Sequence, residues 1–335
     1  MIDALSHRAR LLFILNFLEK NTDEEHPVSS PELIKMLEKE NIKVERKAIY
    51  KDIEALNEMG YDIVTSSGKN RGFFMASRRF ELPEVSLLID AVQAAGFIPQ
   101  KKTESLVGKL EELASCHEAK KLGGRVCIEN RSKSKNESVY YIIEDLNRAI
   151  NESRAIEVIY KKNVVGKNGL EFKEKTMVIN PYALLWDNDH YYLIGNNAKY
   201  DNLTHLRIDR IGKVKILDVT ARHFSEVSEY SQRFDTADYA RKTFNMFGGE
   251  LCRIDLECDE KLLDQMLDQF GNNIFIRKTD DGKFRFSADA LISEGLIGWI
   301  MQFGGSLKVI SPESLKNDVS IRAERLADAY KISSF

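Results

Sequence analysis

Apolar residues recur at helical spacing in three segments of the first sixty residues. The first segment places four leucines on one face of a predicted helix: Leu11, Leu12, Leu15 and Leu18. A second helix is predicted from Ser29, because Ser29 and Glu32 have the spacing of a capping box. The third segment ends at Gly60 and turns three apolar side chains inward: Ile49, Ile53 and Leu56. The pattern therefore predicts three short helices.

The sequence YDIVTSSGKNRGFFM, residues 61–75, predicts two strands joined by a turn. Three helices followed by a hairpin predict a winged helix-turn-helix, which we place at residues 1–80. With Ile49 inside, the third helix and the hairpin tip expose six candidate DNA-contacting residues: Arg46, Lys47, Tyr50, Lys51, Lys69 and Arg71. The like charges of Lys47 and Lys51, one turn apart, cost an isolated helix roughly 0.2–0.5 kcal/mol, which a DNA backbone would offset. The alternative is a solvated basic face, since residues 1–80 carry thirteen Lys/Arg and thirteen Asp/Glu.

Two further amphipathic helices are predicted after the hairpin, in a helical linker and basic arm at residues 81–136. They fit either a dimer interface or packing onto a neighbouring domain of the same chain. Residues 117–135 hold six basic and two acidic residues, a net charge of +4. Such a run is usually a solvated loop, and it could also extend a binding groove.

Residues 137–225 begin with a predicted helix, after which short apolar strands dominate. One helix followed by about five strands predicts a small SH3-like or Sm-like β-barrel. Its segment HLRIDRI is unusual because three charges interrupt a strand. In an unbroken strand Arg207 and Asp209 share one face, whereas Arg210 leaves the opposite face unless a bulge re-aims it. The residues fit either a structural Arg–Asp pair or arginines that await a ligand.

The last region, residues 226–335, has the element order β-α-β-β-α-β-α. This order predicts a ferredoxin-like fold, in which Trp299 and Phe303 are most simply core residues. The complete prediction is an α+β multidomain chain: a winged helix-turn-helix, a helical linker, an SH3/Sm-like barrel and a ferredoxin-like extension.

Composition excludes several classes of function. The chain has 335 residues, 43% of them hydrophobic, and a net charge of −3. It has no apolar run of the roughly 20 residues that a membrane span needs and no signal-peptide pattern. Four cysteines without CxxC spacing indicate reduced thiols in a cytoplasm. We find no nucleotide-binding, hydrolase or metalloprotease motif, and expect neither an enzyme nor a cofactor. His190 beside Asp187 and Asp189 could suggest a metal, but fits a hairpin turn better.

Two stretches of sequence resemble known families. The run VSSPELIKML…VERKAIYKDIEALNEMGYDI resembles the helix-turn-helix of DeoR-type bacterial repressors, with Lys51 where arginine is commoner. The motifs INPYALLW, HYYLIG and HLRIDRI resemble the WYL domain in order and spacing. Tyr191 replaces the tryptophan of that name, and Leu206 replaces a usual phenylalanine. FNMFGGE and GWIMQFGGSLKVISPE resemble the WCX extension that follows many WYL domains.

The resemblance implies a homodimeric transcription regulator that binds double-stranded operator DNA and senses an effector. In the WYL family some members bind single-stranded nucleic acid through a basic and aromatic patch. The corresponding residues here are Tyr160, Tyr192, Arg207 and Arg210, with Asp209 orienting the arginine. Such a patch favours an anionic ligand, either single-stranded nucleic acid or a nucleotide. The rival hypothesis is an RNA- or single-stranded-DNA-binding accessory protein of a phage-defence system, in which the first domain only dimerises.

Overall fold

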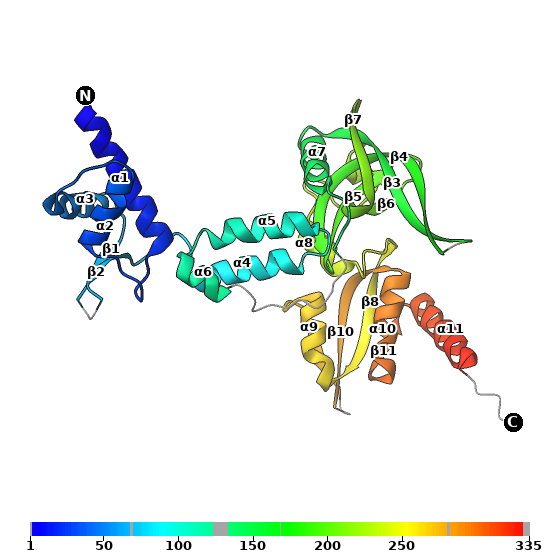
Figure 1. Cartoon of the computed structure of the whole chain (residues 1–335). Helices are drawn as coiled ribbons and strands as arrows, with labels where there is room; N and C mark the ends of the chain where they lie inside the picture. The colour runs from blue at the N-terminus through cyan, green and yellow to red at the C-terminus, as the bar shows by residue number, and fades with distance from the viewer. Residues whose placement is uncertain (1, 68–69, 123–132, 168, 280–281, 331–335) are drawn as a thin grey trace. The chain divides into compact units, whose positions relative to one another are not determined.

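A computed structural model describes residues 2–67, 70–122, 133–167, 169–279 and 282–330. The chain forms two compact units, residues 1–135 and residues 136–335, and each is described by itself. Within the described residues, no helix combines the length and the apolar character that crossing a membrane requires. Figure 1 shows the elements of both units.

The first eighty residues form the predicted winged helix-turn-helix, here called the head. Its elements are α1 (Ile2–Asn21), α2 (Ser30–Lys39), α3 (Arg46–Glu58), β1 (Ile63–Ser66) and β2 (Gly72–Met75). Strands β1 and β2 pair antiparallel as a hairpin. The predicted inward residues of α3 are all buried: Ile49, Ile53 and Leu56. They pack with the buried residues of α1 and α2 in one hydrophobic core.

Local interactions set the ends and the orientation of the head helices. Ser29 and Glu32 form the predicted capping box at the start of α2. Gly60 ends α3 with a φ of 96°, a conformation that glycine adopts without strain. Arg10 on α1 donates a 3.0 Å hydrogen bond and a shorter second one to the buried carboxylate of Asp52 on α3. This salt bridge fixes α3 against α1.

Three helices follow the head in the same unit. They are α4 (Leu82–Ala94), α5 (Gln100–Glu111) and α6 (Cys116–Leu122). The prediction of a loop at 117–135 is wrong at its start, because residues 117–122 continue α6; residues 123–132 lie outside the described part of the chain. Ser115 donates a 2.6 Å hydrogen bond to Asp23, and the rings of His26 and His117 stack 3.7 Å apart. Through these contacts the start of α6 packs on the head.

The second unit begins with helix α7 and a five-stranded antiparallel sheet. The elements are α7 (Val139–Asn151), β3 (Arg154–Gly166), β4 (Gly169–Asp187), β5 (His190–Asn197), β6 (Leu203–Arg207), the 3₁₀ turn η1 (Ile208–Arg210) and β7 (Ile211–Thr220). The strand order is β6-β5-β4-β3-β7. The predicted helix and five strands are confirmed. The predicted barrel does not close, because β6 and β7 are the two edges of an open sheet.

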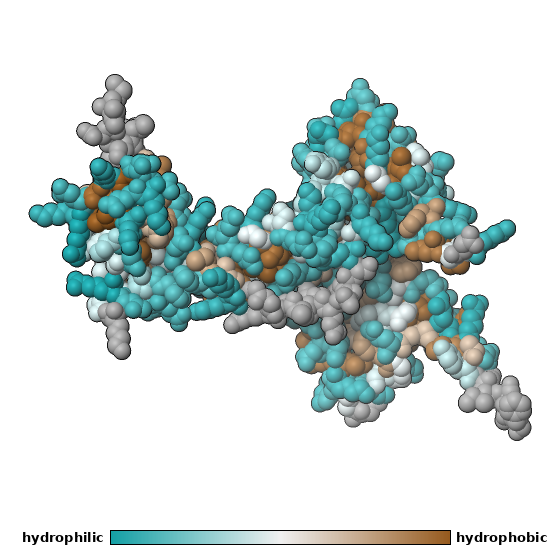
Figure 2. Space-filling model, in the orientation of Figure 1, coloured by the Kyte–Doolittle hydropathy of each residue, from teal (hydrophilic) through white to brown (hydrophobic). Residues whose placement is uncertain are grey.

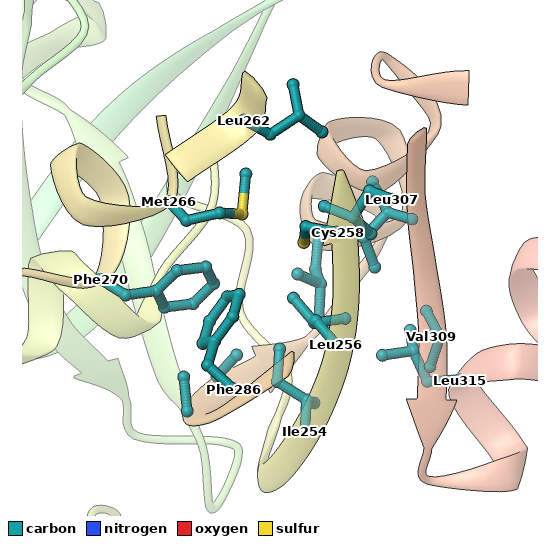
Figure 3. Close-up of a cluster of buried hydrophobic side chains, with 14 of the residues drawn as sticks. Ile254, Leu256, Cys258, Leu262, Met266, Phe270, Phe286, Leu307, Val309 and Leu315 are labelled. Atoms are coloured by element: carbon teal, nitrogen blue, oxygen red, sulfur yellow. The ribbon is translucent and has the colours of Figure 1, made fainter. Parts of the chain in front are cut away.

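A four-stranded sheet with flanking helices forms the end of the chain. Its elements are β8 (Glu250–Asp259), α9 (Leu263–Phe270), β9 (Ile276–Lys278), β10 (Lys283–Ile292), α10 (Glu294–Met301), β11 (Leu307–Ser311) and α11 (Glu313–Ala329). The strand order β11-β8-β10-β9, with antiparallel neighbours, is the predicted ferredoxin-like arrangement. Figure 3 shows side chains of its core, including Leu256, Met266 and Phe286.

The segment between the two sheets covers part of the first one. It includes the turn η2 (Phe224–Glu226) and helix α8 (Thr236–Lys242). Phe234, Tyr239 and Met246 form a buried cluster with Ile194 of β5 and Leu291 of β10. This shared cluster joins the two sheets of the second unit.

Candidate DNA-binding surface and effector patch

The predicted DNA-contacting residues of α3 all face solvent. Arg46, Lys47, Tyr50 and Lys51 are exposed, whereas Ile49 and Asp52 on the opposite face are buried. Hydrophilic residues cover most of the visible face of the head (Figure 2). A helix that is fixed through a buried Arg–Asp pair and exposes three cations can present a rigid basic face to a phosphate backbone.

Tyr50 connects this helix to the wing. The Arg46 guanidinium donates a 3.3 Å hydrogen bond to the Tyr50 hydroxyl, and the tyrosine ring lies edge-on to Phe73 of β2 at 5.3 Å. The hydrogen bond from Arg46, with the charges of Arg46 and Arg71, lowers the pKa of Tyr50. The structure therefore brings Arg46, Tyr50 and Arg71 together. Lys69, the other predicted wing residue, lies outside the described residues.

The charged segment of the central sheet contains the predicted Arg–Asp pair. The Arg207 guanidinium donates two hydrogen bonds to the Asp209 carboxylate, at 3.1 and 2.7 Å. Both side chains are largely buried, with exposed fractions of 23% and 14%. Burial opposes the charge of Arg207, but the hydrogen bonds and the charge of Asp209 outweigh it and raise the pKa of Arg207. Arg207 is therefore a fixed cation with a defined orientation.

The condition under which alternation would place Arg210, an unbroken strand, is not met. The strand is not unbroken: β6 ends at Arg207, and residues 208–210 form the turn η1. The side-chain amide of Asn136 donates hydrogen bonds to the backbone oxygens of Asp209, at 3.4 Å, and Ile211, at 2.8 Å. Side chains alternate between the two faces of a sheet only within a strand. Arg210 lies in the turn η1, so alternation does not confine it to the face opposite Arg207.

Aromatic residues lie beside these charges. Tyr192 on β5 pairs with Arg207 on β6 in the sheet register. Burial raises the pKa of Tyr192, while the charge of Arg207 acts in the opposite direction. Tyr160 on β3 is near enough to affect the electrostatics of both residues. We define the effector patch as Tyr160, Tyr192, Arg207, Asp209 and Arg210.

Sequence reasoning missed His190 as a member of this neighbourhood. Its ring lies edge-on to Tyr192 at 6.2 Å, and its Nδ1 atom is buried without a hydrogen-bond partner among the described residues. Burial, then the positive charges of Arg207 and Arg210, lower the pKa of His190, and Asp209 acts in the opposite direction. The three charges of HLRIDRI therefore all act on the protonation of His190.

The arrangement suits binding more than catalysis. Two arginines supply positive charge, and tyrosine rings supply stacking faces. Within the described part of the chain, no three His, Cys, Asp or Glu side chains are grouped as a metal site.

Three domain-family models match the chain. A helix-turn-helix domain matches residues 10–74, a WYL domain matches residues 141–216 and a WCX domain matches residues 250–327. The order and positions of these matches confirm the predicted domain types. The finer resemblance of the head to DeoR-type repressors stays a prediction.

Two solved structures align with most of the chain. Proteasome accessory factor B/C (PafBC) of Arthrobacter aurescens is 17% identical with a TM-score of 0.27, and the match covers 97% of this chain and 47% of that one. A CRISPR Cas-related protein is 12% identical with a TM-score of 0.37, covering 97% of this chain and 83% of that one. The chain thus spans about half the length of the PafBC chain. No curated protein sequence matches it.

Proposed function

Because the chain has the domain architecture of a WYL-domain transcriptional regulator, we propose that it is a DNA-binding regulator controlled by an anionic effector. In this proposal α3 and the wing bind operator DNA, and the effector patch binds single-stranded nucleic acid or a nucleotide-like ligand. The observation that carries the sensing step is the Arg207 guanidinium, fixed by Asp209 beside Tyr192 and neutral His190. We further propose a cytoplasmic homodimer without enzymatic activity or cofactor.

The DNA-binding step is tested by removing the like-charge pair of α3. Lys47→Ala with Lys51→Ala should weaken binding to DNA from upstream of the protein's own gene. The logarithm of the DNA-binding constant falls as the logarithm of the salt concentration rises. Each lost phosphate contact makes this negative slope shallower by about 0.9, so two lost contacts make it shallower by about two. The control is Lys213→Ala with Lys215→Ala, an equal loss of charge from exposed residues of β7. If both double variants bind DNA alike, α3 is not the DNA-contacting helix.

The sensing step is tested on Arg207 with a fluorescent single-stranded oligonucleotide as the probe. Arg207→Ala should weaken binding at least tenfold, and Arg207→Lys should restore only part of it, because lysine keeps the charge but loses the planar fork. Arg154→Ala, which removes the same charge from β3, is the control. Circular dichroism and the unfolding midpoint show whether each variant folds.

These measurements also separate the proposal from its rivals. If both Arg207 variants fail to fold, the Arg207–Asp209 pair has a purely structural role. Tighter binding of the unmodified protein to single strands than to any upstream duplex would favour the accessory nucleic-acid-binding function instead.

A further inference from the structure

A polar cavity lies between the two sheets of the second unit, outside the effector patch. Its volume is about 530 Å³, within the usual range for small-molecule sites. One wall is the β4–β5 turn at Asp187 and Asn188. The other walls come from the end of α8 and the loop after it, the end of α9, and the exposed side of α10.

The walls combine an aromatic surface with amide groups. Trp299 lines the cavity, and its ring packs against those of Phe244, which also lines it, Phe270 and Phe303. Four amide side chains share the lining: Asn188, Asn245, Gln269 and Gln302. An amide both donates and accepts hydrogen bonds, so such walls can match a ring with both kinds of group on its edge. Arg241, which lies 3.7 Å from the carboxylate of Asp238, shares the lining with Asp187 and Asp268, and the excess of carboxylates disfavours an anionic ligand.

Gly298 is the sequence feature that packing does not explain. It lies inside helix α10, where glycine costs roughly 0.5–1 kcal/mol relative to alanine. A Cβ atom added there would meet no protein atom within 4 Å, so no neighbour requires a glycine. Gly295, one turn earlier, differs: its added Cβ would lie 2.1 Å from the backbone oxygen of Phe244. Gly298 lines the cavity, and a larger side chain at this position would enter it.

The rim of the cavity is built from backbone that non-glycine residues seldom adopt. Asn188 and Asp189 on one side have φ values of 44° and 62°, and Asn245 and Met246 on the other have 51° and 56°. The Asn188 amide donates a long hydrogen bond of 3.5 Å to the Asn245 side chain across the rim. The Asn188 amide also donates a 3.0 Å hydrogen bond to the Asp187 carboxylate, so side-chain hydrogen bonds join the two loops at the rim.

From these observations we infer that the cavity binds an uncharged nucleoside, with the base against Trp299 and its polar edge on the amide side chains. This site is independent of the proposed anion binding at Arg207. The β4–β5 hairpin links it to that patch, because Asp187 lines the cavity and pairs in register with His190, whose ring lies edge-on to Tyr192 at 6.2 Å. A bound nucleoside would therefore be positioned to influence the patch.

Tryptophan fluorescence tests the inference directly, because the chain has two tryptophans, Trp186 and Trp299. The variant Trp186→Phe keeps Trp299 as the reporter. It is titrated separately with adenosine, guanosine, cytidine, uridine and ribose, and calorimetry repeats each titration. At least one nucleoside should give a saturable response in both measurements, and ribose should give none.

The matched variants are Gly298→Leu and Gly108→Leu, made in the Trp186→Phe background. Both glycines lie within helices and have no atom within 4 Å of an added Cβ. Both variants should fold, but only Gly298→Leu should abolish nucleoside binding. Gln302→Ala should weaken it severalfold. Unsaturable titrations with all four nucleosides, an equal response to ribose, or unchanged binding by Gly298→Leu would each overturn the inference. None of these outcomes bears on DNA or oligonucleotide binding, so the proposed function is judged separately.

Discussion

Acidification should destabilise the second unit through His205. This side chain lies on β6, mostly buried, with its Nε2 atom 2.8 Å from the Tyr239 hydroxyl. Burial lowers the pKa of His205 from 6.5 to about 4. Between these values the unfolded state binds more protons than the folded state, so the free energy of unfolding decreases as the pH falls. A pKa difference of one corresponds to about 1.4 kcal/mol, and the total loss is therefore about 3 kcal/mol.

The measurement is urea unfolding at a series of pH values from neutral to about pH 4, followed by tryptophan fluorescence. Both tryptophans lie in residues 136–335, so the signal reports this unit. His205→Phe removes the titrating group and costs about 1 kcal/mol at neutral pH, because the hydrogen bond to Tyr239 is lost. Its stability should depend less on pH, so the variant approaches the unmodified protein on acidification. His190 also has a lowered pKa but is present in both proteins, so its effect cancels. Parallel pH curves for the two proteins would refute the reasoning.

Three further substitutions test the packing. Ser29→Ala removes the capping box of α2 and should cost about 1 kcal/mol, seen as lower amide protection of α2 in hydrogen exchange. Arg10→Ala removes the salt bridge to buried Asp52 and should cost about 1.5–3 kcal/mol of head stability, measured by thermal unfolding. Gly249→Ala places a Cβ 1.9 Å from the backbone oxygen of Ile292, and should lower the free energy of unfolding of the second unit, measured by urea unfolding, by about 1–3 kcal/mol. If one of these variants is as stable as the unmodified protein, the contact that it removes or the clash that it introduces does not affect stability as argued.

Sequence was sufficient where the structural signal is local. The capping box of Ser29, the inward face around Ile49 and the stop at Gly60 each depend on residues within one or two helical turns. The ferredoxin-like order followed in the same way from seven consecutive periodic segments. The salt bridge from Arg10 to Asp52 was not predicted, because it joins residues 42 positions apart and neither stands out in its own helix.

In the central sheet, reasoning from the two-residue period of a strand reaches its limit. It predicted correctly that Arg207 and Asp209 pair, because both the alternation and the turn allow that contact. Its condition, an unbroken strand, does not hold at Arg210, because that residue lies in η1. The turn is held by Asn136, more than seventy positions away in sequence. No pattern within HLRIDRI contains that information.

His190 was interpreted as a residue of the β4–β5 hairpin. That interpretation is compatible with a second place for this residue, beside the effector patch. It does pair with Asp187 across the β4–β5 hairpin. The same position sets its ring against Tyr192, which the register in turn places opposite Arg207. A structural role in a turn therefore positioned the imidazole beside the effector patch.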